Sequence, residues 1–273
     1  MKCTKCKTEI PDGKLRCPNC KEFQITGHSV SNGSVLLSDV VSSDIDRIAT
    51  GPWDEVFGTT FKKGVPVSKG VARSSVNLLG GAPGCGKSTL ILQGADKVCT
   101  QIPGEVLYLA AEEPTDQIKA RADRLGIEWQ GRIRMVPCMT GEANVEDIII
   151  QYEPIFLLVD SVSAMAGDDM NMQVKICMVI KNFCSKYRIP AIALSHINKS
   201  GEIAGLEALQ HAVDSVISFF PDGDGQDAPR VLHVEKNRNG LAFITYALSM
   251  TEKGLVPFQV AEEDEEDDDD EDD

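Results

Sequence analysis

The sequence predicts an α/β fold, in which a mostly parallel β-sheet carries helices on both faces and is preceded by a small cysteine-rich unit. Three observations lead to this prediction. From residue 75 onward, short apolar runs alternate with amphipathic stretches at helical spacing, as in sheets with crossover helices. A glycine-rich loop joins the first apolar run to the first amphipathic stretch. Four cysteines stand in two close pairs within the first twenty residues.

The composition is that of an ordinary soluble globular protein. The 273 residues suffice for about two domains, and a content of 42% hydrophobic and 25% charged residues excludes collagen-like, wholly disordered and membrane-embedded chains. No apolar run approaches the ~18 residues that span a bilayer, and the N-terminus lacks the apolar stretch of a signal peptide. We therefore expect a cytoplasmic protein with no membrane partner.

The first expected element is a zinc ribbon over residues 1–24. Two Cys-x-x-Cys pairs supply four soft thiolates, which suit a closed, tetrahedral, structural zinc site. Because the segment is too short to bury a core, the metal would take the place of one. The expected ligands are Cys3, Cys6, Cys17 and Cys20. The remaining cysteines, an odd number in apolar stretches, fit reduced core residues of a cytosolic protein.

The other elements follow in order along the chain. Residues 25–45, rich in Ser, Gly and Val, are expected to be a linker, and residues 46–258 a second domain whose segment 64–70 is an exposed, lysine-bearing loop. Buried strands are expected at residues 76–79, 106–109, 155–159 and 191–194. Helices are expected at residues 88–98, 115–125, 145–152 and 173–187. Strands at residues 213–219, 231–234 and 244–248 should extend the sheet in antiparallel fashion.

The net charge of −15 comes mostly from the end of the chain. Residues 262–273 are twelve consecutive acids, and without them 30 acids face 27 bases. Such a run has nothing to bury and repels itself, so residues 259–273 are expected to form a disordered acidic tail. The tail either keeps the chain soluble, or competes with nucleic acid for a basic surface, or recruits a partner.

The glycine-rich loop carries the strongest functional signal. It has the complete pattern G-x-x-x-x-G-K-S between a predicted strand and a predicted helix, the setting in which backbone N–H groups and the helix N-terminus bind nucleotide phosphates. Lys87 would reach the β- and γ-phosphates, and Ser88 would coordinate Mg²⁺. The expected nucleotide-binding residues are Gly81, Ala82, Pro83, Gly84, Cys85, Gly86, Lys87, Ser88 and Thr89.

Acidic residues at two other strand ends complete a hydrolytic site. Asp160 ends the apolar run 155–159 and is expected to hold Mg²⁺ directly or through water. Glu112 follows the run 106–109 and is expected to orient or deprotonate the attacking water, with Glu113 as the alternative. His196, just after the run 191–194, could sense the γ-phosphate, or it could be structural.

Together these motifs resemble the bacterial DNA-repair ATPase family RadA, also called Sms, whose members are RecA-like and carry an N-terminal zinc ribbon. The resemblance covers nearly the whole folded chain and is more specific than the phosphate loop alone. It rests on the cysteine pairs, on Thr50 and Gly51, and on motifs at residues 80–89, 117–126, 199–205, 236–240 and 250–255.

The resemblance implies a RecA-like P-loop NTPase core that uses ATP, Mg²⁺ and Zn²⁺. Its members form rings, here expected to be hexamers, on single-stranded DNA and drive branch migration of branched DNA in recombination and repair, alongside a RecA-type recombinase. In this chain the segment 196–205 would face DNA. Lys236 and Arg238 fall on the family's Lys-Asn-Arg-Phe-Gly motif, whose basic residues act on nucleotide or DNA at a subunit boundary. The catalytic roles fall on Lys87, Ser88, Glu112 and Asp160.

The chain departs from the family pattern in two places. Asn239 stands where the family has Phe, which removes an apolar or stacking side chain from the motif. The family also continues into a Lon-protease-like domain where this sequence has its acidic tail, so we expect a minimal relative from a bacterial or phage-infected cell. The alternative function is a RecA/KaiC-like nucleotide switch that binds a protein partner without moving DNA. A replicative helicase is a third possibility, for which the chain lacks an N-terminal assembly domain.

Overall fold

The computed structural model describes residues 2–3, 5–11, 17–20, 45–138, 145–167, 169–196, 206–225 and 227–259. The acidic run, nearly all of the expected linker and the segment 197–205 lie outside these ranges. Among the described residues, no helix has both the length and the apolar character needed to cross a membrane.

The described part of the second domain is built on a nine-stranded sheet. Its strands are β5 (Val76–Gly81), β6 (Val106–Ala110), β7 (Ile133–Pro137), β8 (Phe156–Asp160), β9 (Ala191–His196), β10 (Ser215–Pro221), β11 (Arg230–Asn237), β12 (Thr245–Thr251) and β13 (Gly254–Pro257). Their spatial order is β13-β12-β11-β10-β5-β9-β8-β6-β7. From β10 to β7 all neighbours are parallel, and β11, β12 and β13 extend the sheet in antiparallel fashion.

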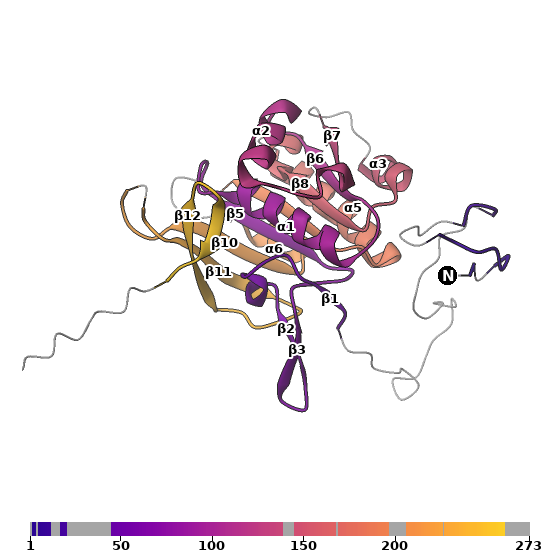
Figure 1. Ribbon diagram of the computed structural model, residues 1–273, viewed down its shortest axis with the longest axis horizontal. Helices are drawn as coiled ribbons and strands as arrows, with labels where there is room; N and C mark the ends of the chain where they lie inside the picture. Colours follow the sequence, from indigo (N-terminus) through magenta and orange to yellow (C-terminus); the bar gives the residue numbers. More distant parts are fainter. Residues whose placement is uncertain are drawn as a thin grey trace, which may run out of the picture.

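Helices cover both faces of this sheet (Figure 1). They are α1 (Lys87–Gln101), α2 (Thr115–Leu125), α3 (Val145–Tyr152), α4 (Val162–Ala166), α5 (Met170–Tyr187) and α6 (Leu206–Ala212). Helices α1 and α2 pack into one buried cluster, whereas α3, α4, α5 and α6 pack into a second cluster on the opposite face. The predicted fold class, a mostly parallel sheet with helices on both faces, is therefore confirmed.

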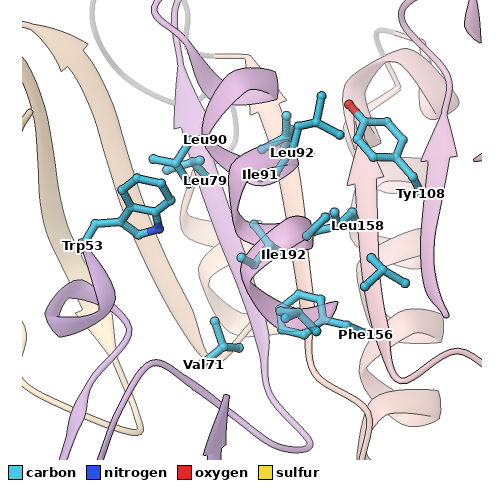
Figure 2. Close-up of a cluster of buried hydrophobic side chains, with 14 of the residues drawn as sticks. Trp53, Val71, Leu79, Leu90, Ile91, Leu92, Tyr108, Phe156, Leu158 and Ile192 are labelled. Carbon is cyan, nitrogen blue, oxygen red and sulfur yellow. The ribbon is translucent and has the colours of Figure 1, made fainter. Parts of the chain in front are cut away.

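The central strands are buried on both sides, and successive residues supply the two clusters in turn. In β6, Val106 and Tyr108 belong to the α1 side, while Leu107 and Leu109 belong to the α5 side. This follows from the two-residue period of a strand, and it explains why each strand reads as a continuous apolar run. Figure 2 shows the α1 side, where Leu90, Ile91 and Leu92 of α1 lie against Leu79, Leu158 and Ile192 of the sheet.

Two strand predictions need correction. Residues 213–219 were expected in the antiparallel extension, but β10 runs parallel to β5, and the direction first reverses at β11. Residues 64–70 were expected to be a loop, but β3 (Val65–Lys69) pairs with β2 (Thr59–Lys62) in a hairpin that projects from the sheet layers (Figure 1). Its turn, Lys63-Gly64, has φ values of 51° and 80°, as two-residue hairpin turns require.

The segment before β5 joins the hairpin to the sheet. Strands β1 (Arg47–Ile48) and β4 (Val71–Ala72) pair in antiparallel fashion, and a 3-10 turn, η2 (Asp54–Val56), lies between β1 and β2. The Arg47 guanidinium donates hydrogen bonds to Thr60 Oγ1 at 2.8 Å, to the Gly70 carbonyl at 3.1 Å and to the Asn239 carbonyl. Arg47 therefore fastens the base of the hairpin to the turn between β11 and β12.

Candidate functional site

The phosphate loop lies where β5 ends and α1 begins, at the carboxyl edge of the parallel strands. Gly84 and Gly86 have φ values of 79° and 112°, which side chains rarely allow. A Cβ at Gly81 would meet the Phe219 carbonyl oxygen at 2.4 Å, so this close approach also requires glycine. The predicted sequence pattern is thus matched by a backbone that curls around the start of α1.

Lys87 is folded back onto this loop. Its side chain is only 6% exposed, and Nζ donates to the carbonyls of Gly81 at 2.7 Å and Ala82 at 3.0 Å. The ammonium group is therefore held at the loop. Burial raises the pKa of the neighbouring Cys85 thiol, and the charges of Lys87 and Arg230 oppose this rise. Arg230, the first residue of β11, is thus a second cation near the loop, one that sequence reasoning missed.

Asp160 ends β8 at the same edge and is 2% exposed. Its Oδ2 accepts a hydrogen bond from the Tyr108 hydroxyl, and its Oδ1 is buried with no hydrogen-bond partner among the described residues. Burial raises the pKa of Asp160, the hydrogen bond from Tyr108 and the nearby Ser88 hydroxyl lower it, and the charges of two nearby glutamates raise it further. A buried carboxylate oxygen without a donor, beside the Ser88 hydroxyl, is a fitting arrangement for Mg²⁺.

Glu112 and Glu113 follow β6 and differ in their partners. The backbone N–H of Glu112 donates to the Asp160 carbonyl at 3.1 Å, which brings this segment beside β8. Glu113 accepts two hydrogen bonds from the Arg121 guanidinium on α2, at 2.7 and 2.9 Å. Glu112 Oε2 lies 3.2 Å from His196 Nε2. Of the two acids, Glu112 has the partner that stands next to the phosphate loop.

His196 is the last residue of β9 and pairs in register with Gly81, the first residue of the phosphate loop. Its Nδ1 is buried and has no hydrogen-bond partner within the described ranges. The segment that follows it, 197–205, lies outside those ranges. The sheet thus brings the phosphate loop, Asp160, Glu112 and His196 together at one edge, as the predicted site requires.

Lys236 and Arg238 are not part of this group. Lys236 stands in β11 opposite Val216, and the Arg238 N–H donates to the Asp214 carbonyl at the amino end of β10. Asp214 in turn lies beside Val76, the first residue of β5. Val76 and the phosphate loop are separated by the length of β5, about 17 Å at ~3.3 Å per residue. Both cations therefore lie far from the phosphate loop of their own chain, and their expected action on nucleotide or DNA at a subunit boundary stays a prediction.

Instead, both cations hold the connection between α6 and β10. Lys236 Nζ donates to the carbonyl of Val213 at 3.0 Å and to that of Gln210 near the end of α6. Asp214 Oδ1 lies 2.9 Å from Lys181 Nζ and 3.6 Å from Arg238 Nη1. Burial lowers the pKa of Lys236, and the charges of Arg238 and Lys181 lower it further. The sequence analysis did not single out Asp214 or Lys181, because neither belongs to a motif.

The four N-terminal cysteines form the second candidate site, a metal centre. All four Sγ atoms lie within 4.8 Å of one another. The Sγ atoms of Cys3 and Cys20 are 3.5 Å apart, and those of Cys6 and Cys17 are 3.4 Å apart. Hydrogen bonds with the side chain and backbone of Thr8 lower the pKa of Cys6 to about 5. Four converging sulfurs, one of them readily ionised, suit zinc.

Comparisons with known proteins agree with the resemblance seen in the motifs. The family model described as the AAA domain matches residues 63–202. The chain is 31% identical to the DNA repair protein RadA of Chlamydia pneumoniae over 93% of this chain and 57% of that protein, and 31% identical to RadA of Bacillus subtilis over 93% and 58%. RadA of Escherichia coli is 28% identical over 93% and 58%. The chain spans less than two thirds of the length of these relatives.

The fold also has a counterpart among solved structures. A KaiC-like protein of Pyrococcus horikoshii superposes with a TM-score of 0.62 and 16% sequence identity, over 79% of this chain and all of that one. At this identity the likeness concerns the fold. The predicted resemblance to the RadA family is confirmed by the sequence matches, and the predicted RecA-like P-loop core by the sheet and this superposition.

Proposed function

The chain belongs to the AAA domain family, and on that premise we propose that it is a DNA-dependent ATPase of recombination and repair. The observation that carries the proposal is the convergence of the phosphate loop, Asp160 and Glu112 at one edge of the sheet. A P-loop lysine, a hydroxyl with a carboxylate for Mg²⁺, and a second carboxylate for water are the parts that ATP hydrolysis needs. The curated relatives are named DNA repair proteins.

In the proposed reaction each residue has a separate task. The phosphate loop and Lys87 bind the phosphates of ATP, and the lysine charge stabilises the transferred group. Ser88 and Asp160 would hold Mg²⁺, which neutralises phosphate charge when bound. Glu112 orients the attacking water and accepts its proton. His196, whose Nε2 lies 3.2 Å from Glu112 Oε2, would sense whether the γ-phosphate is present and transmit this to the segment after β9.

We further propose that the chain acts as a ring on single-stranded and branched DNA, together with a RecA-type recombinase. The support is the similarity to RadA over 93% of the chain. A ring would also give Lys236 and Arg238 a nucleotide to act on, because a neighbouring subunit could present its own. The N-terminal cysteines would hold one structural zinc per chain.

The rate of ATP turnover with and without single-stranded DNA tests the proposal. We expect turnover in Mg²⁺, stimulation by DNA, and loss of turnover in Lys87→Ala with an unchanged thermal midpoint. An ATP turnover rate of Lys87→Ala within a few-fold of that of the unmodified chain would refute the assignment of the ATPase site. Turnover that DNA leaves unchanged would refute DNA dependence while the ATPase assignment stands.

One observation favours the alternative, a nucleotide switch that binds a protein partner. The hairpin β2–β3 and the turn between β11 and β12 line a groove of 540 Å³. Two exposed apolar side chains, Phe61 and Leu241, line this groove. The same hairpin and turn also carry the exposed side chains of Val65, Val67 and Phe243, and Phe243 is 78% exposed. Exposed apolar patches commonly bind proteins. A partner that binds only the ATP-loaded chain, combined with turnover insensitive to DNA, would favour the switch.

A further inference from the structure

Tyr108 is a buried polar side chain to which the proposed reaction gives no task. It stands in the middle of β6 and is 0% exposed. Because it pairs with Leu158 of β8, it faces the side of the sheet that also carries Asp160, two residues further along β8. Figure 2 shows its ring in the buried cluster, with the hydroxyl oxygen at the end away from Phe156. A buried phenol hydroxyl needs a hydrogen-bond partner.

The partner that it finds is the carboxylate expected to hold Mg²⁺. The hydroxyl donates to Oδ2 of Asp160, while Oδ1 is buried and has no partner among the residues that the structure describes. Ser88, the other expected magnesium ligand, stands beside the same carboxylate and lowers its pKa. Oδ2 of Asp160 is therefore fixed by a hydrogen bond from the neighbouring strand β6, and Oδ1 remains available to bind a ligand.

We infer that Tyr108 is a positioning residue of the magnesium site: its hydroxyl fixes one oxygen of Asp160 and leaves the other for the ion or for a water of the ion's shell. The inference rests on the proposed function, because it assigns Asp160 to Mg²⁺. Partners that orient a metal ligand in this way commonly change metal affinity 10- to 100-fold when they are removed.

The competing explanation is that Tyr108 only fills space. The two explanations differ in the hydroxyl alone, because a phenylalanine ring would fill the same volume in the cluster. Tyr108→Phe therefore keeps the packing and removes the bond to Asp160. Tyr187→Phe is a matched control, since Tyr187 is also buried but belongs to the cluster on the other face of the sheet.

The test measures metal binding without turnover. A fluorescent ADP analogue is titrated at increasing Mg²⁺, and binding of Mn²⁺ as a probe ion is followed by electron paramagnetic resonance. In Tyr108→Phe we expect the half-saturating metal concentration to rise about tenfold. The affinity for nucleotide in chelator and the thermal midpoint should stay near those of the original chain. Tyr187→Phe should leave the metal dependence unchanged.

The possible results test the role of Tyr108 and the proposed ATPase function separately. If the original chain requires Mg²⁺ for tight nucleotide binding and Tyr108→Phe requires no more, the inference is wrong and the proposed function stands. If the unmodified chain binds nucleotide equally well with and without Mg²⁺, the result contradicts the magnesium site of the proposed function, and with it the inference that depends on that site. Should Tyr108→Phe not fold, near-ultraviolet difference spectra of the triple variant Tyr152→Phe, Tyr187→Phe, Tyr246→Phe decide, because Tyr108 is its one remaining tyrosine. A tyrosine signal that changes on addition of Mg²⁺ to the ADP-bound protein supports the inference, and its absence overturns it.

Discussion

Glu112 and Glu113 are adjacent acids whose replacement should affect different properties. Glutamine removes the charge of either residue and keeps its shape. Glu113 is bound through two hydrogen bonds to Arg121, and Glu112 faces His196 beside the phosphate loop. We expect Glu113→Gln to lower the free energy of unfolding with a small effect on turnover. We expect Glu112→Gln to lower turnover with a small effect on stability.

The stability cost follows from the burial of the Glu113–Arg121 pair. The two side chains are 27% and 22% exposed, so the pair lies between surface and interior. Exposed ion pairs contribute ~0.2–1 kcal/mol, and hydrogen bonds to charged groups contribute ~1.5–3 kcal/mol. We therefore expect a loss of about 1–2 kcal/mol. For a domain of this size that corresponds to a fall in the thermal midpoint of about 2–8 °C.

The kinetic cost follows from the role proposed for Glu112. A positioned general base contributes about 10²–10⁴-fold to a rate, so Glu112→Gln should lower kcat at least about 100-fold. Its affinity for ATP should change little, because the carboxylate acts on water rather than on the phosphates.

The assay measures kcat for ATP and the thermal midpoint for both variants, with Arg121→Gln as the control. Arg121→Gln removes the other half of the pair, so it should reproduce the stability loss of Glu113→Gln while kcat stays within a few-fold. The reasoning is refuted if Glu113→Gln shows the larger loss of kcat with an unchanged midpoint, because Glu113 would then be the base.

Three further predictions concern the zinc unit, the tail and Lys236. Cys17→Ser should lose the single zinc per chain and leave the thermal midpoint of the ATPase domain unchanged, as metal analysis and calorimetry would report; intact protein without zinc would contradict this. Deletion of residues 262–273 should tighten binding to single-stranded DNA at low salt. Added salt should reduce the difference in DNA affinity between the full-length and the truncated chain, because it screens the charges of the tail. Equal affinities of both forms at low salt would exclude competition by the tail. Lys236→Met should speed amide hydrogen exchange in α6, because Lys236 Nζ bonds to carbonyls at its end; unchanged exchange there would contradict the anchoring role.

The parallel core was predictable because burial on both faces leaves a simple pattern. Strands such as β6 and β8 are short apolar runs, and α2 ends at Leu125 because Gly126 adopts the left-handed conformation that terminates helices. The phosphate loop was equally predictable, because glycines at fixed spacing are required by its backbone. These features depend on neighbours in the sequence, and so the sequence alone reports them.

The direction of β10 and the strand character of the hairpin were not predictable in this way. Strand β10 is as apolar as an antiparallel strand would be, and its orientation depends on α6 bringing the chain back to the amino end of β5. The hairpin β2–β3 leaves most of its side chains exposed, so no apolar pattern marks it. Strand β7 lies at the sheet edge with mixed exposure and was missed for the same reason.

Within the site, residue types were predictable and partners were not. Either of the two adjacent glutamates after β6 could be the base, and they are distinguished by their partners, Arg121 on α2 for Glu113 and His196 at the end of β9 for Glu112. Tyr108 reads as one more apolar residue of a buried strand, and its bond to Asp160 depends on the register between β6 and β8. Such pairings join residues 8 and 52 positions apart, and they depend on how the strands and helices pack.

The position of Lys236 and Arg238 limits the role that either can have at a nucleotide. Both stand near the amino edge of the sheet, while the phosphate loop lies at the carboxyl edge, so only nucleotide bound by a second chain is within reach. Lys236 would first have to release two backbone carbonyls, which would leave them without a donor. The Arg238 side chain is 49% exposed and lies 3.6 Å from Asp214, which Lys181 also neutralises. Arg238 can therefore leave its partner at a lower cost than Lys236. Of the two, Arg238 is the better candidate for a contact across a subunit boundary, and Lys236 for the anchor of α6.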